Sequence, residues 1–131
     1  VSHPLGQRLI HDQPYPNVRF SPAVPHDQLV PLIADADFGF LYLRQDHPAN
    51  RISSQKVIQF LAQGKPFFCS WLSEYEHAGP AVHLSNDAQS AVEAIRKFRT
   101  VGDSAEARAE RLRLAHQQLF PSLFTRLPFR L

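Results

Sequence analysis

The hydrophobic residues of this chain fall into patterns that predict four short strands. Continuous apolar runs at residues 38–43 and 66–70 predict strands buried on both faces, as the strands of parallel sheets are. A shorter strand is predicted at 81–84, and the alternation of polar and apolar residues at 17–20 predicts another. The chain is therefore expected to contain a small sheet.

Apolar residues at helical spacing predict two helices between these strands. At 27–36 they recur at intervals of three and four residues, and Asp27 can cap the helix. A second helix is predicted at about 54–63, ending at Gly64, because glycine readily takes the left-handed conformation that follows a helix. Prolines and a glycine make residues 1–16 a loop with at most a short element near 7–11.

The last third of the chain predicts two further helices, separated by Gly102. The first begins at a cap formed by Asn86 or Asp87. The second covers 104–119, and Pro121 is expected to end it. The first of these helices, reaching about residue 98, places Ala88, Ala91, Val92 and Ile95 at the spacing of one inner face.

Strands that alternate with helices predict the fold class. The order indicates βαβ units and an α/β, Rossmann-like domain with a mainly parallel, open sheet and helices on both faces. In such sheets, ligands bind beyond the carboxyl ends of the strands. The predicted binding region therefore comprises the loops at 21–27, 44–54 and 70–79.

Length and composition fit one domain. The chain has 131 residues, 44% of them hydrophobic, so it can bury a core. Its one cysteine excludes an internal disulfide and a zinc site built from several cysteines. No apolar stretch approaches the roughly 20 residues of a spanning helix. We expect a cytoplasmic domain that is a piece of something longer, since no methionine and no signal peptide are present.

Charge is distributed unevenly along the chain. Residues 1–95 hold six Lys and Arg against nine Asp and Glu, whereas 96–131 hold eight against three. The basic region ends in a tail in which phenylalanines and arginines alternate, and such a tail suits an anionic membrane surface or another acidic partner. A solvated helix face is an equally good interpretation of the same charges.

The start of the 54–63 helix is the segment that best predicts chemistry. Ser53 and Ser54 open it, and Lys56 lies in its first turn, where a cation is mildly unfavourable. A bound phosphate would reverse that cost, because hydroxyl groups, free N–H groups and an ammonium all favour it. Gln59 and Gln63 share the face of Lys56. The alternative is a solvated surface lysine, and no Walker loop or GxGxxG is present.

Other polar residues give weaker signals. The seven histidines show no spacing typical of a zinc site, so neither a metal nor a cofactor is predicted. His26 is of interest because it lies in a loop of the predicted binding region. Glu74 and Glu76 follow a strand and could contact sugar hydroxyls. No nucleic-acid partner is expected.

One motif resembles a known family. The stretch Ser-x-Lys-x-x-Gln-Phe-Leu-Ala-x-Gly-Lys-Pro at 54–66, followed by an apolar strand, is similar to the donor-binding half of GT-B glycosyltransferases. Within that family, the order of motifs resembles the bacterial membrane-associated glucuronosyltransferase of xanthan assembly. The shared features are an Asn-Val pair at 17–18, His26 with Gln28, and a Phe-Gly strand start at 38–39.

The resemblance implies a function and a set of site residues. It implies that 1–131 is a single nucleotide-sugar-binding domain, with UDP-sugar as the expected donor and a missing N-terminal GT-B domain as a partner. Lys56 and Gln59 would contact the diphosphate beside Ser53 and Ser54. The loop that contains Ala23 and Val24 would border the nucleoside, with His26 nearby.

Departures from the family pattern refine this expectation. The Glu-x7-Glu pair of retaining members is replaced by Arg51 and Gln59, which favours an inverting mechanism. Its catalytic base is expected outside this chain. The resemblance thus implies a bacterial inverting transferase of polysaccharide or glycolipid assembly. Its basic tail would either pack on the missing N-terminal domain or attach the protein peripherally to the inner membrane. The alternative is a non-catalytic α/β interaction module that docks through the tail.

Overall fold

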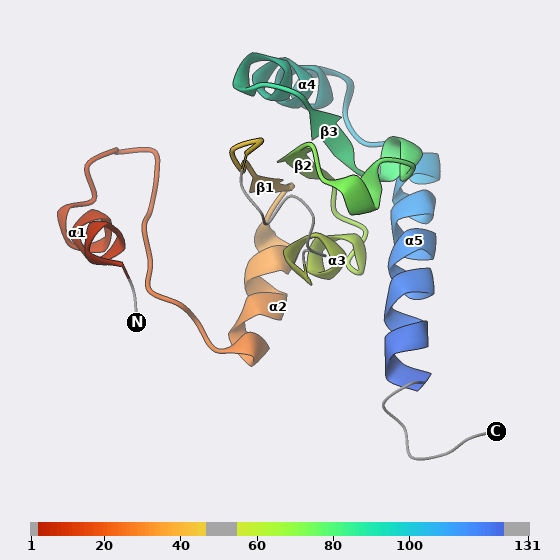
Figure 1. Ribbon diagram of the computed structural model, residues 1–131, viewed down its shortest axis with the longest axis horizontal. Coiled ribbons are helices and arrows are strands. Elements are labelled where there is room, and N and C mark those ends of the chain that lie inside the picture. Colours follow the sequence, from red (N-terminus) through yellow and green to blue (C-terminus); the bar gives the residue numbers. More distant parts are fainter. Residues whose placement is uncertain (1–2, 47–54, 125–131) are drawn as a thin grey trace. The chain divides into compact units, whose positions relative to one another are not determined.

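The computed structural model describes residues 3–46 and 55–124, with side chains described as far as residue 118. The chain divides into two compact units, residues 1–30 and residues 31–131, each of which is described by itself. The first unit is helix and loop, whereas the second holds the sheet and most of the helices (Figure 1).

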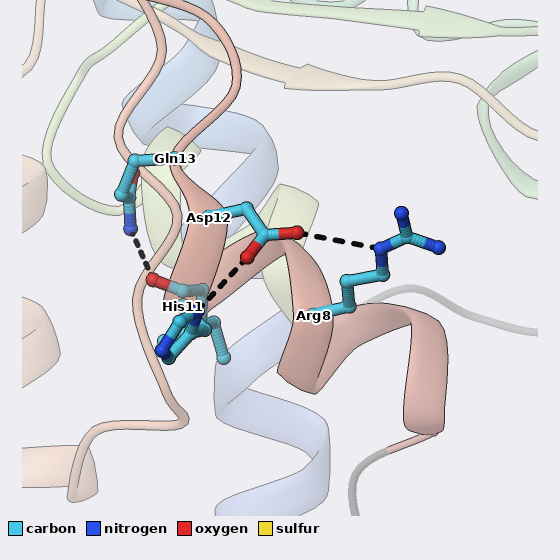
Figure 2. Close-up of polar contacts among 5 residues, drawn as sticks. Arg8, His11, Asp12 and Gln13 are labelled. Carbon is cyan, nitrogen blue, oxygen red and sulfur yellow. Dashed lines mark hydrogen bonds and ion pairs between the residues drawn. The ribbon is translucent and has the colours of Figure 1, made fainter.

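The first unit contains α1 (Pro4–Asp12), which is longer than the short element expected near 7–11. Figure 2 shows how the end of α1 is held: the Asp12 carboxylate accepts from Arg8 Nε at 3.3 Å and lies 2.8 Å from His11 Nδ1. These bonds lower the pKa of the Asp12 carboxyl, with His11 as the largest cause. Gln13 then takes a left-handed conformation, with a φ of 43°, and its side chain amide donates to the Ile10 carbonyl.

The strand predicted at residues 17–20 is wrong. This segment has no strand assignment, and a turn covers Pro16 and Asn17. The Gln13 side chain takes the place of a neighbouring strand, because it accepts from the Phe20 N–H at 2.9 Å and donates to the Phe20 carbonyl at 2.6 Å. A local side chain thus satisfies the backbone groups that a ladder would otherwise pair.

The sheet of the second unit is parallel. Within the described residues it has three strands in the order β1 (Gly39–Leu41), β2 (Phe67–Ser70) and β3 (His83–Ser85). Gly39 pairs with Phe67, and Phe68 pairs with His83. This confirms the α/β class and the parallel sheet that the apolar runs predict. Strand β1 is shorter than the predicted 38–43, β2 lacks only the first residue of 66–70, and β3 begins two residues and ends one residue later than 81–84. The expectation that the 38–43 run is buried on both faces is wrong, because β1 lies at the edge of the described sheet and Phe40 is 53% exposed.

Helices cover both faces of this sheet (Figure 1). On one face, α3 (Gln55–Leu61) and α5 (Ala105–Phe124) enclose the buried core. On the other face, α4 (Ala88–Val101) packs on β2 and β3, and Phe98 meets Phe68 edge to face at 5.7 Å. The core of the first face comprises Val57, Leu61, Phe67, Cys69, Leu72, Tyr75, Ala81, Val82 and Ala115.

The remaining elements connect the strands. Helix α2 (His26–Asp35) precedes β1, within one residue of the prediction at each end. Two single-turn 3-10 helices, η2 (Ser73–Tyr75) and η3 (Gly79–Ala81), lead from β2 to β3 where a loop was expected. No long helix is needed there, because these turns bring the chain back to the amino end of β3.

Most helix ends follow from local residues. Gly64 has a φ of 69° after α3, and Gly102 has a φ of 83° after α4. The Asp87 carboxylate accepts from the Ser90 N–H at 2.7 Å, which caps α4 and lowers the pKa of that carboxyl. The expected end of the last helix before Pro121 is wrong, because α5 continues to Phe124. A proline removes one helical hydrogen bond, and here the helix continues past it.

Candidate functional site

Two parts of the predicted binding region, residues 44–46 and 70–79, follow β1 and β2 at the carboxyl edge of the sheet. The loop at 21–27 was expected to follow a strand and to join this region; that expectation is wrong, because residues 17–20 form no strand and the loop belongs to the first unit. The chain leaves β1 at this edge and returns through α3 to the opposite end of β2, so α3 begins at the carboxyl edge. Ser70 connects β2 to the segment that follows β1, because its buried hydroxyl accepts from the Leu43 N–H at 2.8 Å. The Trp71 N–H donates to the Ser85 carbonyl at 3.1 Å and joins β2 to β3 in the same place.

The residues of α3 divide between a buried and an accessible face, as its sequence predicts. Val57 and Leu61 are fully buried in the core. Lys56 is exposed in the first turn, and Gln59 is partly exposed one turn later. Among the described residues, Lys56 has no carboxylate within ion-pair distance. Its ammonium is thus accessible to an anionic ligand at this edge.

The other predicted ligand contacts are distributed over different parts of the chain. Ser53 and Ser54 lie outside the described residues, so their role in opening the helix stays a prediction. Ala23, Val24 and His26 belong to the first unit, whereas Lys56 and Gln59 belong to the second. His26 is the exposed first residue of α2, and Val24 is partly buried just before it. The structure therefore brings Lys56 and Gln59 together on one helix.

The region after β2 adds accessible carboxylates to the same edge. Glu74 lies in η2 and Glu76 follows it, and both side chains are exposed. Tyr75 between them points inward, where burial raises the pKa of its hydroxyl and its oxygen lies 3.4 Å from Gln118 Oε1. Two carboxylates thus remain candidates for contact with sugar hydroxyls.

Two titratable side chains of the sheet, Cys69 and His83, have pKa shifts that favour their uncharged forms. Burial raises the pKa of the Cys69 thiol to about 12, so this thiol stays protonated and unreactive at neutral pH. Burial also lowers the pKa of His83, and the nearby charge of Arg111 acts in the same direction. The His83 ring stacks on Phe68, with 4.4 Å between the ring centroids. Along residues 3–46 and 55–124, no three His, Cys, Asp or Glu side chains are grouped so that they could hold a metal ion.

A concave region that the sequence patterns did not predict lies at the opposite edge of the sheet. This amino-edge cleft has a volume of about 470 Å³. Its lining residues come from the two positions before β1, from the turn before β2, and from the last turns of α4, the first turn of α5 and the connection between these helices. The signal available in the sequence was weak, because these residues are separated by up to 71 positions, from Asp37 to Arg108, and only the fold brings them together.

Comparison of the chain with protein-family models, with curated proteins and with solved structures found no match. None of the helices in the described parts of the chain combines the length and the hydrophobicity that crossing a membrane would require.

Proposed function

We propose that this chain binds a nucleoside-diphosphate sugar, with UDP-sugar as the preferred class, and forms the donor-binding domain of a bacterial inverting GT-B glycosyltransferase. The observation that carries the proposal is the position of Lys56. Its exposed ammonium stands in the first turn of the helix that begins at the carboxyl edge of a parallel sheet. Ligands of open α/β sheets bind at this edge.

The chemistry of this edge suits a diphosphate. A diphosphate carries several negative charges, and an ammonium without a carboxylate partner offers it a charge-assisted hydrogen bond. Gln59 lies one turn further along the helix, where its amide can donate to the same group or to the sugar. In the proposal, Ser53 and Ser54 supply further hydroxyl donors.

The chain supplies binding rather than acid–base chemistry in this proposal. An inverting transfer needs a general base that takes a proton from the acceptor hydroxyl. The proposal assigns that base to a second, N-terminal GT-B domain, and it names no catalytic residue among 1–131. The reaction class is glycosyl transfer in polysaccharide or glycolipid assembly, where the acceptor is held by the partner domain.

Calorimetric titration of the full chain with UDP and with UDP-sugars tests the proposal. Replacing Lys56 by alanine should weaken binding about tenfold to a hundredfold, since a hydrogen bond to a charged group contributes about 1.5–3 kcal/mol. Lys97→Ala is the matched control, because Lys97 is an exposed lysine of α4. Absence of binding, or equal affinity in the Lys56→Ala and Lys97→Ala variants, would contradict the proposal.

The competing hypothesis is that the chain is a non-catalytic interaction module that docks through its basic tail, and the same titration distinguishes the two. This competing hypothesis predicts that UDP has no effect, whereas removal of residues 120–131 abolishes binding to vesicles that contain anionic lipids. The proposed donor-binding function predicts that the truncated chain still binds UDP.

A further inference from the structure

The amino-edge cleft has the size of a small-molecule site and is lined by both charged and aromatic residues. Its volume of about 470 Å³ falls within the roughly 300–1,000 Å³ that ligand pockets occupy. All of its lining residues belong to the second unit. The cleft lies at the amino ends of the strands, so it is separate from the carboxyl edge of the proposed donor site.

Three cationic side chains, Lys65, Arg99 and Arg108, line this cleft. The Lys65 ammonium donates to the Ala34 carbonyl at 2.9 Å, which leaves the two guanidinium groups as the main anion-binding candidates. Among the described residues, neither Arg99 nor Arg108 forms a salt bridge. Both are exposed at the surface of the cleft.

The end of the Arg108 side chain lies against Gly64. A Cβ atom at Gly64 would stand only 2.7 Å from Arg108 Nη1 and 2.9 Å from its Cζ. The Arg108 side chain therefore packs directly on Gly64, and a side chain at position 64 would have to displace it. The φ of 69° favours glycine at this position.

Arg111 supports this arrangement from inside the protein. It is only 1% exposed, its Nε donates to the Gly64 carbonyl at 2.9 Å, and its Nη2 pairs with the Asp103 carboxylate. The charge of Asp103, which also lines the cleft, is thereby balanced by Arg111. Of the acidic residues in the lining, Asp37 alone lacks a described salt bridge, so three positive charges, on Lys65, Arg99 and Arg108, face one unpaired carboxylate.

Aromatic rings stand beside these charges. Phe38 and Phe98 line the cleft and meet at 6.3 Å between ring centroids, close to edge to face. Both also contact Phe68 of β2, so the rings are held in place by the sheet. Their accessible edges offer an apolar surface next to Arg99, which follows Phe98 directly in α4.

We propose that the amino-edge cleft binds a small organic anion. Its carboxylate or phosphate group contacts Arg99 and Arg108, and its apolar part lies on Phe38 and Phe98. The two guanidinium groups select the negative charge, and the rings select an organic ligand over an inorganic ion. The volume admits a molecule of a few to some tens of non-hydrogen atoms. This site does not depend on the proposed donor-binding function.

Amide chemical shifts of the full chain, measured by heteronuclear NMR, test this site. The chain is titrated with benzoate and with phenyl phosphate, which distinguish the two head groups, and with inorganic phosphate and benzamide, which lack the ring or the charge. At least one organic anion should give saturable shifts at residues 64–66 and 98–103. Inorganic phosphate and benzamide should bind at least about tenfold more weakly.

Substitutions of arginines inside and outside the cleft distinguish binding in the cleft from non-specific attraction between charges. Arg99→Gln combined with Arg108→Gln should weaken binding at least about tenfold. Arg96→Gln is the matched control, because Arg96 is an exposed arginine of α4 that does not line the cleft. If the double variant unfolds, the single variant Arg99→Gln still tests the proposal, because Arg99 is exposed. Absence of saturable shifts with both anions at millimolar concentration, or equal binding in all variants, would overturn the proposal.

Discussion

Arg111 is the largest fully buried side chain among the described residues, and it connects three segments. Its guanidinium reaches from α5 to the Gly64 carbonyl after α3 and to Asp103 after α4. A buried charge is costly unless its hydrogen bonds are satisfied, and here both partners are supplied by the turns that begin and end neighbouring elements. One residue thus fixes the position of two loops.

Replacing Arg111 by alanine should strongly destabilise the fold. The change leaves the buried Gly64 carbonyl without its donor, which costs about 1–3 kcal/mol, and the lost packing of a fully buried side chain adds to this cost. The Asp103 side chain is 34% exposed, so water can solvate its carboxylate in the variant. Urea denaturation followed by circular dichroism measures the free energy of unfolding. Arg113→Ala is the control, because Arg113 pairs with Glu110 at the surface of the same helix, and the unfolding midpoint should change little. Similar midpoints for both variants would contradict the role of Arg111.

The partly buried His83 should make stability depend on pH. Its pKa is lowered in the fold from the ordinary 6.5, first by burial and then by Arg111. The unfolded chain therefore takes up a proton at a higher pH than the folded chain does. The contribution of neutral His83 is fully present above about pH 6.5 and is lost as the pH falls through the lowered folded pKa.

Unfolding by urea at several values between about pH 7 and pH 5 measures this effect. His83→Gln should flatten the decline in the free energy of unfolding over this window. His77→Gln is the control, because His77 is exposed and its replacement should leave the decline unchanged. An unchanged slope in His83→Gln would show that other groups cause the dependence.

At the scale of elements, helix ends depend on single side chains. The Ser104 hydroxyl accepts from the Ala107 N–H at 3.0 Å and caps α5, the helix that carries Arg108 and Arg111. Ser104→Ala should lower the free energy of unfolding by about 1 kcal/mol, whereas Ser104→Asp keeps an acceptor and should stay close to wild type. Urea denaturation distinguishes the two. Equal loss in both variants would mean that the hydroxyl does not act as the cap.

The sequence predicted those elements whose signals are local. The buried run of β2, the glycines after α3 and α4, and the cap at Asp87 each depend on neighbouring residues, and all are confirmed. The run around β1 does form a strand, but its expected burial on both faces is wrong, because β1 is an edge strand of the described sheet. The strand at 17–20 was predicted from alternation alone. Pairing also needs a partner, and the Gln13 side chain occupies the backbone groups of Phe20 instead.

The candidate sites were predictable to different degrees. The exposed position of Lys56 and the buried position of Val57 follow from the helical period, so one sequence suffices to place them on opposite faces. The amino-edge cleft was not predictable. Phe38, Lys65 and Arg108 lie far apart in the chain, and only the parallel pairing of β1 with β2 and the packing of α5 bring them together.

At the scale of the molecule, one parallel sheet carries two candidate binding regions at its opposite edges. The carboxyl edge presents Lys56 at the start of α3, and the amino edge presents Arg99 and Arg108 beside two aromatic rings. The two proposals name different ligands and different residues, so either can fail without the other. The whole account depends first on the claim that a nucleoside diphosphate binds at the carboxyl edge.

Mapping of amide chemical shifts upon addition of UDP to the full chain tests that claim most directly. The account predicts saturable shifts at residues 53–59, in the segment around Lys56, and their loss in Lys56→Ala but not in Lys97→Ala. Shifts confined to the amino-edge cleft, or no saturable shifts at all, would contradict it.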